Sequence, residues 1–300
     1  MDIILEVKNL KKNYGVIEAV KDLSFKVERG TVYAFLGPNG AGKSTTINII
    51  TTLLEPNSGD VFVNGQTSKD YIRRKIGVVF QGNVLDNHLT VKENLLYRGA
   101  FYLDSKNLNK RYEELREMLG FKDFENQKFK TLSGGQKRRI EIARALFSKP
   151  EILLLDEPTT GLDPETRQVV WQIIDELREQ QNITIFLTTH YMEEAANADH
   201  VIIIDKGLIK AEGSPAALKE AYSKDRIKLV PHDEAKLEDT LNEHNYIYRV
   251  VADQYIITFD TTLETLDLID KVKENIKSFE VLKGTLDDVF INVIGGENHV

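Results

Sequence analysis

The chain contains no cysteine, and none of its apolar runs is long enough to cross a membrane. Without cysteine there can be no disulfide bond, thiolate metal site or cysteine nucleophile. A membrane-spanning helix needs about 20 consecutive apolar residues, whereas the longest apolar runs here have the length of buried strands. The first ten residues lack the basic stretch and apolar core of a signal peptide. These absences together are typical of a cytosolic protein.

Positive charge is scarce in the last part of the chain. From Ser214 onward, 10 Lys and Arg stand against 17 Asp and Glu, so this part holds −7 of the total charge of −8. Binding to nucleic acid or to anionic lipid needs clustered Lys and Arg, and we therefore expect no nucleic-acid partner. The composition also changes around residues 213–215. We predict a first domain over residues 1–213 and an accessory domain over residues 214–300.

Apolar strands that alternate with helical patterns predict an α/β fold, with a mainly parallel sheet covered on both faces. In the first domain the predicted strands are 3–9, 18–30, 31–37, 60–63, 76–81, 151–156, 183–190 and a hairpin at 200–213. The predicted helices there are 43–54, 165–180 and those of a helical region at 90–145. The second domain is predicted as a small α/β unit with strands 226–230, 246–252, 254–260 and 278–282 and helices 233–244, 263–277 and 285–295.

The segment GPNGAGKST lies between a predicted strand and a predicted helix. Its spacing matches the phosphate-binding loop G-x-x-x-x-G-K-[ST], in which glycine N–H groups surround the phosphates. In such a loop the lysine reaches the β- and γ-phosphates and the following hydroxyl binds Mg²⁺. The residues predicted to bind the nucleotide here are Gly37, Pro38, Asn39, Gly40, Ala41, Gly42, Lys43, Ser44 and Thr45.

Other polar residues stand at or next to the ends of predicted strands. Asp156 ends a buried strand and is placed to hold a metal ion, and Glu157 follows it. A carboxylate in that position can polarise the attacking water, which typically contributes about 10²–10⁴-fold in rate. His190 and Gln81 end two further strands, and Tyr14 offers a ring that can stack on adenine. The sequence therefore predicts a nucleotide-hydrolysing site at one edge of the sheet.

A second Ser-Gly-Gly stretch, LSGGQ at residues 132–136, begins a predicted helix. The N-terminus of a helix with bare glycines is itself an anion site. One nucleotide in one chain does not need two such sites, so this stretch calls for another explanation.

Taken in order, these motifs resemble those of the nucleotide-binding subunits of ABC transporters. The resemblance covers roughly residues 2–213 and implies that the chain binds ATP and Mg²⁺ and hydrolyses ATP. It carries over an aromatic loop, Walker A, Q-loop, signature, Walker B, D-loop and switch histidine, found here at Tyr14, 37–45, Gln81, 132–136, 152–156, 161–163 and His190. The implied catalytic residues are Lys43, Gln81, Glu157 and His190, and the implied metal ligands are Ser44, Gln81 and Asp156.

The same resemblance explains the second Ser-Gly-Gly stretch. In this family two ATPase domains pair head to tail, and the signature of one closes over the γ-phosphate held by the other. A second ATPase subunit is thereby implied as a partner. It is either another copy of this chain, which the intact catalytic motifs favour, or a paralogue. The residues implied to contact the partner's ATP are Ser133, Gly134, Gly135, Gln136 and Asp163, with a basic stretch at 137–139 just beyond them.

The resemblance further implies a separate membrane permease, whose short helices would enter a groove beside the Q-loop, and a place at the cytoplasmic face of the cell membrane. The C-terminal part is similar to the drug- and polymer-exporting branch, including the daunorubicin-resistance type. That branch often ends in a phrase close to LDDVF at residues 286–290, which favours export. Leu286, Val289, Phe290 and Val293 also have the spacing of a helix core, and the two interpretations are compatible.

Three alternatives remain open from the sequence. One is a soluble ABC-type ATPase that acts on the ribosome or on nucleic acid, which the single Walker A motif and the acidic tail disfavour. Another is an importer ATPase. The third concerns the accessory domain, which can serve as a clamp between two copies of the chain or as a binding module for the permease or a regulator.

Overall fold

A six-stranded sheet forms the centre of the N-terminal part of the chain in a computed structural model, which describes residues 2–295. Its strand order is β5-β6-β7-β3-β8-β9, and every neighbouring pair from β5 to β8 is parallel. The bounds are β3 (Val32–Leu36), β5 (Ile76–Val79), β6 (Ile152–Asp156), β7 (Thr184–Thr189), β8 (His200–Asp205) and β9 (Leu208–Gly213). All residues of β3, β6 and β7 are buried, as in a sheet covered on both faces. The predicted mainly parallel sheet is confirmed.

A second, antiparallel sheet has the order β2-β1-β4, with β1 (Ile3–Tyr14), β2 (Ile17–Glu28) and β4 (Ser58–Val63). Strand β1 continues well beyond Asn9, where the sequence predicts that it ends. Asn9 has a φ of +47°, and the pairing with β2 shifts register between Val7 and Leu10. An irregularity of this kind breaks the alternation of apolar residues without ending the strand.

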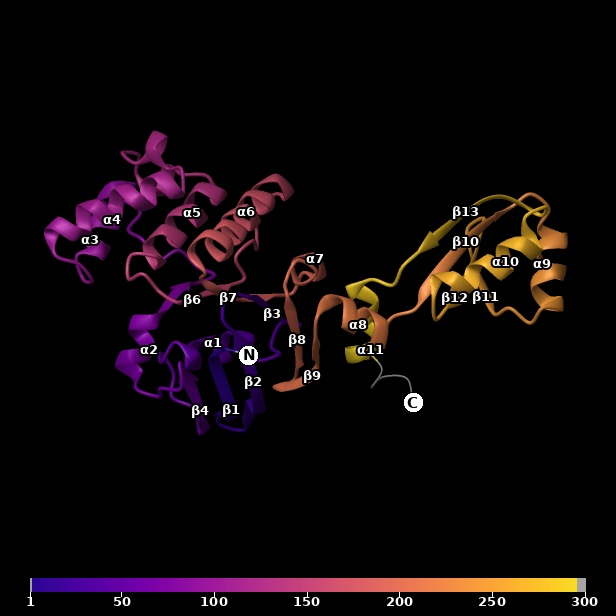
Figure 1. Cartoon of the computed structure of the whole chain (residues 1–300), viewed down its shortest axis with the longest axis horizontal. Coiled ribbons are helices and arrows are strands. Elements are labelled where there is room, and N and C mark those ends of the chain that lie inside the picture. Colours follow the sequence, from indigo (N-terminus) through magenta and orange to yellow (C-terminus); the bar gives the residue numbers. More distant parts are fainter. Residues whose placement is uncertain (1, 296–300) are drawn as a thin grey trace. The chain divides into compact units, whose positions relative to one another are not determined.

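The helices of this unit gather on two sides of the strands. Figure 1 shows α3, α4, α5 and α6 together above the central sheet, away from β1, β2 and β4. The α-helices of this part of the chain are α1 (Lys43–Ile50), α2 (Lys69–Lys75), α3 (Val91–Gly99), α4 (Ser105–Met118), α5 (Gly134–Ala145), α6 (Pro164–Gln181) and α7 (Met192–Ala195). The short helix α2 is missing from the predictions because Ile72 is its only buried residue and leaves no apolar periodicity to detect.

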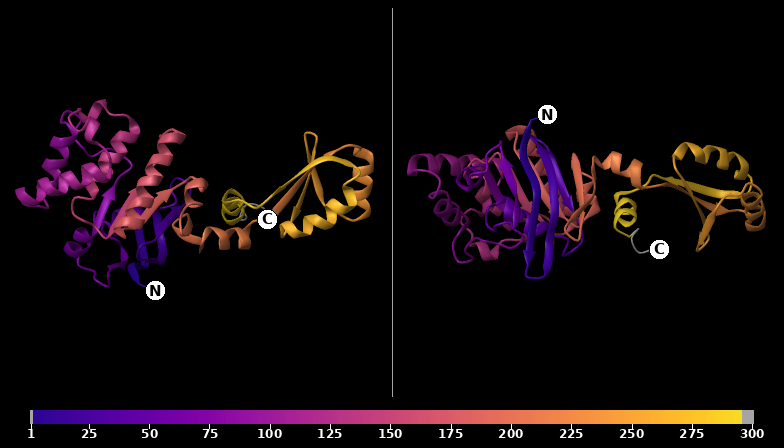
Figure 2. Two further views of the ribbon diagram at one scale, coloured as in Figure 1. Left: turned by 45° about the horizontal axis from the view of Figure 1, so that its top comes forward. Right: turned by 90° about the horizontal axis from the view of Figure 1, so that it is seen from below.

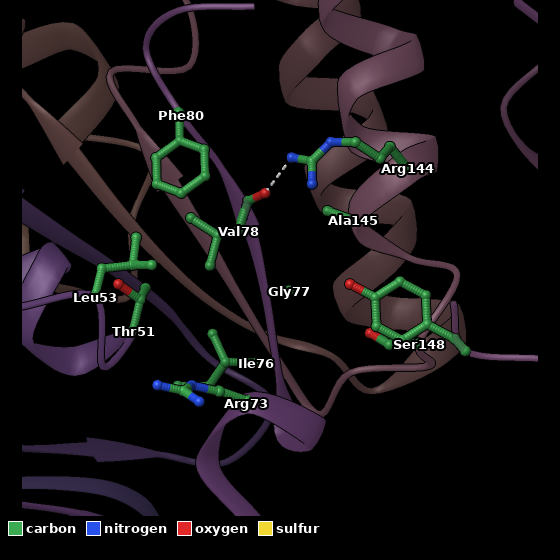
Figure 3. A pocket seen from close by; sticks show the side chains of 11 residues that line it. Thr51, Leu53, Arg73, Ile76, Gly77, Val78, Phe80, Arg144, Ala145 and Ser148 are labelled. Carbon is green, nitrogen blue, oxygen red and sulfur yellow. Dashed lines mark hydrogen bonds between the residues drawn. The ribbon is translucent and has the colours of Figure 1, made fainter. Parts of the chain in front are cut away.

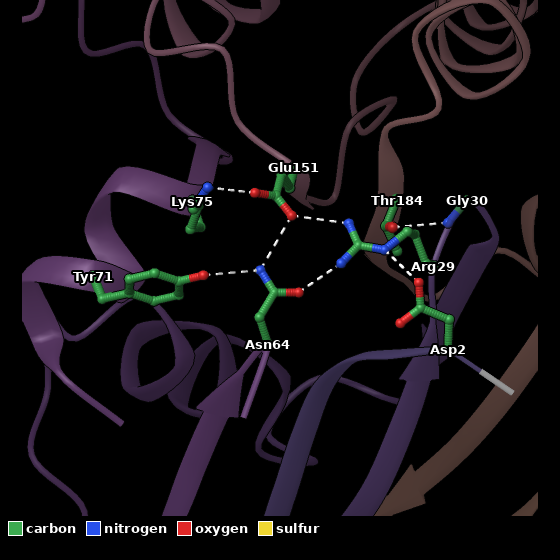
Figure 4. A network of polar contacts seen from close by, with 8 residues as sticks. All are labelled: Asp2, Arg29, Gly30, Asn64, Tyr71, Lys75, Glu151 and Thr184. Carbon is green, nitrogen blue, oxygen red and sulfur yellow. Dashed lines mark hydrogen bonds and ion pairs between the residues drawn. The ribbon is translucent and has the colours of Figure 1, made fainter. Parts of the chain in front are cut away.

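A network of polar side chains joins segments that lie far apart in the sequence (Figure 4). The Glu151 carboxylate, just before β6, accepts hydrogen bonds from Lys75, from Arg29 at 2.8 Å and from Asn64 at 3.1 Å. Arg29 also donates to Asn64 Oδ1 at 2.6 Å and to Asp2 Oδ2 at 2.7 Å. These bonds, first of all that from Lys75, lower the pKa of Glu151 to about 2. The network therefore connects the antiparallel sheet, α2 and the central sheet.

The chain divides into two compact units between Glu212 and Gly213, next to the predicted boundary at residues 213–214. The second unit has an antiparallel sheet of order β11-β12-β10-β13. Figure 2 shows α9 and α10 beside this sheet. The bounds are α8 (Pro215–Tyr222), β10 (Asp225–Pro231), α9 (Glu234–Glu243), β11 (Tyr248–Val251), β12 (Gln254–Phe259), α10 (Thr265–Val272), β13 (Ile276–Leu282) and α11 (Leu286–Gly295). One core unites the sheet with both helices, formed by Ile227, Leu229, Leu237, Leu241, Tyr255, Ile257, Leu268 and Val272.

One prediction for the second unit is wrong, and one of its helices is not predicted. The predicted helix 263–277 ends at Val272, because Ile276 already pairs with Pro231 as part of β13. Helix α8 is missing from the predictions, although Ser214 at its N-cap followed by Pro215 at its first position is a recognised start signal. Within residues 2–295, no helix combines the length and the apolar character that a membrane crossing requires.

Candidate active site

The loop between β3 and α1 has a backbone shape that depends on glycine. Gly40 and Gly42 have φ values of +82° and +106°, in the region that other residues rarely adopt. A Cβ atom at Gly42 would also lie 2.5 Å from the Ala19 carbonyl oxygen. Gly42 is the N-cap of α1 and supplies no side-chain acceptor. The first-turn N–H groups therefore stay available to an anion, which fits the phosphate site predicted for residues 37–45.

Lys43 is the buried cation of this loop, with 5% of its surface exposed. Its Nζ donates to the carbonyl oxygens of Gly37 at 2.7 Å and Pro38 at 3.1 Å. It also lies 3.9 Å from Glu157 Oε1. Burial lowers the pKa of Lys43, while the charges of Glu157 and Asp156 oppose this shift. The loop carbonyls therefore hold the ammonium group at the phosphate loop, and the Glu157 carboxylate lies close to it.

The structure brings three predicted catalytic residues, Lys43, Gln81 and His190, together around the carboxylate of the fourth, Glu157. Gln81 Nε2 donates to Glu157 Oε2 at 2.9 Å, and Thr160 Oγ1 donates to the same oxygen at 3.1 Å. His190 Nδ1 lies 3.5 Å from Glu157 Oε1, the oxygen that Lys43 also approaches. The Glu157 side chain is only 11% exposed. A carboxylate held in this way can accept a proton from a water molecule placed beside it.

Asp156 is held by a threonine that the sequence does not single out. Thr188 Oγ1 donates to Asp156 Oδ1 at 2.6 Å and accepts from the Glu157 N–H at 3.0 Å. Asp156 and Thr188 are partners in the parallel register of β6 and β7. Knowledge that β6 pairs with β7 in this register would identify Thr188 as the neighbour of Asp156. The sequence alone does not show this pairing.

Gln81 does not end a strand, as the sequence predicts, because β5 stops at Val79 and Gln81 lies in the following loop. This loop is held by helix α5. Glu141, 1% exposed, accepts from the N–H groups of Val84 at 2.8 Å and Leu85 at 3.2 Å. Glu141 therefore positions the loop that begins with Gln81, although no motif points to it.

Arg138 is a second residue that the motifs do not reveal. It belongs to the basic stretch 137–139 that follows the signature, yet it is buried, with 8% of its surface exposed. It lies four residues before Ile142 and so shares the inner face of α5 with it. Its guanidinium donates to the carbonyls of Phe80, Glu157 and Pro158.

The signature segment begins α5 with a reciprocal cap. Gln136 N–H donates to Ser133 Oγ at 3.2 Å, and Ser133 N–H donates to Gln136 Oε1 at 3.0 Å. A Cβ atom at Gly135 would lie 2.3 Å from Thr166 Cγ2, so α5 and α6 approach closely here. Asp163 in turn caps α6 by accepting from the N–H and hydroxyl of Thr166 at 2.9 and 2.6 Å. These residues have a local structural role, and their contact with a partner's ATP stays a prediction.

The ring predicted to stack on adenine belongs to Tyr14, the last residue of β1. Tyr14 is 49% exposed. Lys12 Nζ lies 5.7 Å from the centre of its ring. The exposed ring leaves room for a base to stack, and its contact with the nucleotide stays a prediction.

The residues around the phosphate loop have the donor chemistry that Mg²⁺ and ATP require. Among residues 2–295, no three His, Cys, Asp or Glu side chains cluster as a metal site. Mg²⁺ bound with a nucleotide needs no such cluster, because one or two protein oxygens and the phosphates complete its shell. Ser44 is exposed at the start of α1, and Asp156 Oδ1 is already fixed by Thr188. The bound ion would neutralise phosphate charge, and Ser44, Gln81 and Asp156 would hold it.

Two family models match the chain. The ABC transporter family matches residues 20–160, and the C-terminal domain of DrrA1-3-like ATP-binding proteins matches residues 213–294. The second match covers the unit that carries no nucleotide motif.

Curated relatives match over nearly the whole length. The Nod factor export ATP-binding protein I of Burkholderia lata is 35% identical over 98% of this chain and 97% of its own. The daunorubicin/doxorubicin resistance ATP-binding protein DrrA of Streptomyces peucetius is 36% identical over 97% of this chain and 92% of its own. The linearmycin resistance ATP-binding protein LnrL of Bacillus subtilis is 34% identical over 97% and 98%.

Solved structures share the fold of the first unit. The cbiO1 protein of Clostridium perfringens, part of an ABC transporter complex, has a TM-score of 0.68 and 31% identity over 73% of this chain and 91% of its own. A dimeric ATP-binding cassette bound to ADP and Pi has a TM-score of 0.64 and 32% identity over 70% and 98%. With the phosphate loop and the carboxylate beside it, these matches show that the chain belongs to the ATP-binding subunits of ABC transporters and is an ATPase.

Proposed function

We propose that this ATPase powers a separate membrane permease that exports a drug, an antibiotic, a lipid or a polymer. The observation that carries the proposal is the match along the whole chain, including the C-terminal unit, to proteins named for export and for drug resistance. A match limited to the ATP-binding domain, which all ABC transporters share, would support ATP hydrolysis but would not indicate export. The matching C-terminal unit favours the exporting branch.

In the proposed reaction, the residues at the edge of the sheet divide the work. Lys43 contacts the terminal phosphates, and Glu157 accepts the proton of the attacking water. Gln81 and His190, both next to the Glu157 carboxylate, hold it and the water in line. Ser44, Gln81 and Asp156 hold Mg²⁺. The geometry supports these roles because Lys43, Gln81 and His190 converge on the Glu157 carboxylate.

We also propose that two copies of the chain share each ATP. The signature begins a helix with bare glycines, and such an N-terminus attracts an anion. A Cβ atom at Gly134 would lie 3.0 Å from Leu162 Cδ2, so a larger residue would crowd the start of this helix. In the proposed dimer, Ser133 and Gly135 face the γ-phosphate held by the partner's loop. ATP then closes the dimer, and hydrolysis opens it.

A groove beside the Gln81 loop is the proposed site for the permease. A cavity of about 380 Å³ lies between the segment after α1, strand β5 and helix α5 (Figure 3). Leu53 and Tyr102 line it and are 63% and 59% exposed. Arg144 forms part of its wall and donates to the Val78 carbonyl. An amphipathic helix of the permease fits such a groove. Docking there would place the chain at the cytoplasmic face of the membrane.

For the C-terminal unit we propose an accessory role in assembly, either as a clamp between two copies or as a module that binds the permease. Its exposed apolar side chains, among them Ile247, Leu263 and Leu266, support a surface that contacts another protein. A chain that lacks residues 214–300 separates the two roles. Loss of the ATP-free dimer favours the clamp, whereas an intact dimer that no longer holds its permease favours the module.

Affinity capture of the tagged chain from its host's membranes in mild detergent tests the main proposal. The wild-type chain is expected to retain a multi-spanning protein in stoichiometric amount. Leu53→Asp combined with Tyr102→Asp should lose that protein while ATP hydrolysis persists. Gln172→Asp is the control, because this side chain is exposed on α6 and lies outside both the groove and the C-terminal unit.

Two outcomes of the capture would overturn the proposal. Recovery of ribosomal or nucleoprotein components without a membrane protein would favour a soluble ATPase. A permease accompanied by an extracytoplasmic substrate-binding protein would favour import.

A further inference from the structure

The buried Arg138 joins two loops that carry the catalytic side chains. Its Nη1 donates to the Phe80 carbonyl at 2.7 Å, directly before Gln81. Its Nη2 and Nε donate to the carbonyls of Glu157 at 2.8 Å and Pro158 at 2.6 Å. A single guanidinium therefore fixes the backbone on both sides of the hydrogen bond between Gln81 and Glu157.

The backbone that Arg138 holds at Glu157 is in an uncommon conformation. Glu157 has a φ of +46°, which is rare for a residue with a side chain and persists only where the surroundings enforce it. The Glu157 carbonyl is bonded to Arg138, and its N–H is bonded to Thr188. Both peptide groups that flank this residue are thus fixed, and their orientation decides where the carboxylate points.

Three features argue that Arg138 does more than fill the core. Burying a cation is costly, so an apolar residue would serve packing alone at least as well. Its three donors all reach carbonyl oxygens of the two catalytic loops. It also lies on α5, five residues after the signature Ser133 that caps this helix. Arg138 therefore stands between the signature and the carboxylate of its own chain.

We propose that Arg138 is a positioning residue for ATP hydrolysis, which sets the relative placement of Gln81 and Glu157. Because α5 begins at the signature, a shift of this helix moves both loops together. If the two copies share ATP as proposed above, engagement of the partner's nucleotide at Ser133 is transmitted to Glu157 through this side chain. The positioning itself rests only on the ATPase activity, and the transmission rests on the proposed dimer.

Arg138→Lys tests the positioning role. Lysine keeps the charge, but its compact ammonium cannot reach three carbonyls in the fork geometry of a guanidinium. We expect kcat for ATP to fall by about 10–100-fold, with KM and the number of ATP molecules bound per chain within twofold of wild type. Arg111→Lys is the control, because Arg111 is also buried and donates to one carbonyl, that of Leu146 at 2.8 Å. It should leave kcat unchanged.

A double-mutant cycle with Gln81→Ala separates positioning from general damage. If Arg138 acts through Gln81 and Glu157, the double variant should lose about as much kcat as the more impaired single variant. If instead the kcat losses of the two single variants multiply in the double variant, and fewer ATP molecules bind per chain, Arg138 has only a structural role and the proposal is overturned. A kcat for Arg138→Lys equal to that of wild type would overturn it as well.

The transmission is read from the dependence of the rate on ATP concentration. A Hill coefficient above one in the wild type that falls to one in Arg138→Lys supports it. A Hill coefficient that is unchanged by the substitution contradicts transmission but leaves the positioning role to the kcat data. If the wild-type protein forms no ATP-dependent dimer, the shared-site proposal fails, whereas the kcat comparison still decides the role of Arg138.

Discussion

The two units of the chain use their polar side chains differently. In the nucleotide-binding unit, polar residues collect where the parallel strands β6 and β7 end, and Asp156, Glu157, Thr188 and His190 meet there. Parallel strands end at the same edge of a sheet, so one edge becomes a site. The C-terminal sheet is antiparallel, and its strand ends alternate between two edges. Chemistry is therefore readable from motifs in the first unit, while the second offers mainly a surface.

The largest effect is expected from a change that alters one atom of the nucleotide site. Glu157→Gln keeps the size of the side chain but removes the proton acceptor. ATP hydrolysis should fall by about 10²–10⁴-fold, because the water loses its base while the phosphate loop and Lys43 are unchanged. Phosphate release measures the rate, and light scattering with MgATP should show a stable dimer.

If hydrogen exchange of the C-terminal amides is the same in Glu157→Gln as in the wild type, the loss of hydrolysis is confined to the first unit. That outcome sharpens the contrast between the two units. A protein that stays in its ATP-free oligomeric state with MgATP would contradict the sharing of ATP between two copies. Full hydrolysis would remove Glu157 from the role of base.

The nucleotide site illustrates how much of the structure the sequence predicts. Glycine spacing locates Lys43, and polar residues at or shortly after the ends of strands locate Glu157, His190 and Gln81. These residues can be found because the phosphate loop needs a fixed spacing between a strand and a helix. The roles of Thr188 and Arg138 are not predicted from the sequence, because no motif or fixed spacing marks these residues. Their partners are a strand neighbour and three backbone carbonyls, and neither leaves a pattern along the chain.

The C-terminal unit shows the same limit in its fold. Apolar alternation predicts its strands, and apolar residues at helical spacing predict the helices α9 and α11. The end of α10, in contrast, depends on the pairing of Ile276 with Pro231. The predicted core stripe of α11 holds for Leu286 and Val289, which are 4% and 0% exposed, while Phe290 is half-buried. Pairing between distant segments decides such boundaries, and local propensity cannot encode it.

An intermediate effect is expected in the LDDVF phrase. Asp288 accepts from Arg226 at 2.8 Å and from the N–H and hydroxyl of Thr285 at 2.9 and 2.8 Å, so it closes the start of α11. Asp288→Ala should destabilise the C-terminal unit by about 1–3 kcal/mol and leave the ATPase rate unchanged. Hydrogen exchange of the α11 amides measures the loss.

Asp287→Ala is the neighbouring control, because Asp287 is exposed and its removal should change exchange little. A parallel fall in the ATPase rate of Asp288→Ala would break the contrast between the units. It would show that the accessory unit takes part in catalysis.

The smallest effect is expected at the polar network of Figure 4, which concerns stability within the nucleotide-binding unit. Glu151 is 31% exposed, and its pKa lies near 2, below the ordinary value of 4.5, chiefly because Lys75 donates to it. The carboxylate therefore stabilises the folded chain at pH values above about 4.5, and this contribution disappears as the pH falls toward 2. Because water screens a partly exposed group, we expect Glu151→Gln to lower the stability by about 1 kcal/mol at pH 7. Urea unfolding at pH 7 and pH 3 measures the difference from wild type, which should shrink at the lower pH. A difference that stays constant with pH would show that the network acts through shape alone, so that the charges joining the antiparallel sheet to the central sheet contribute nothing.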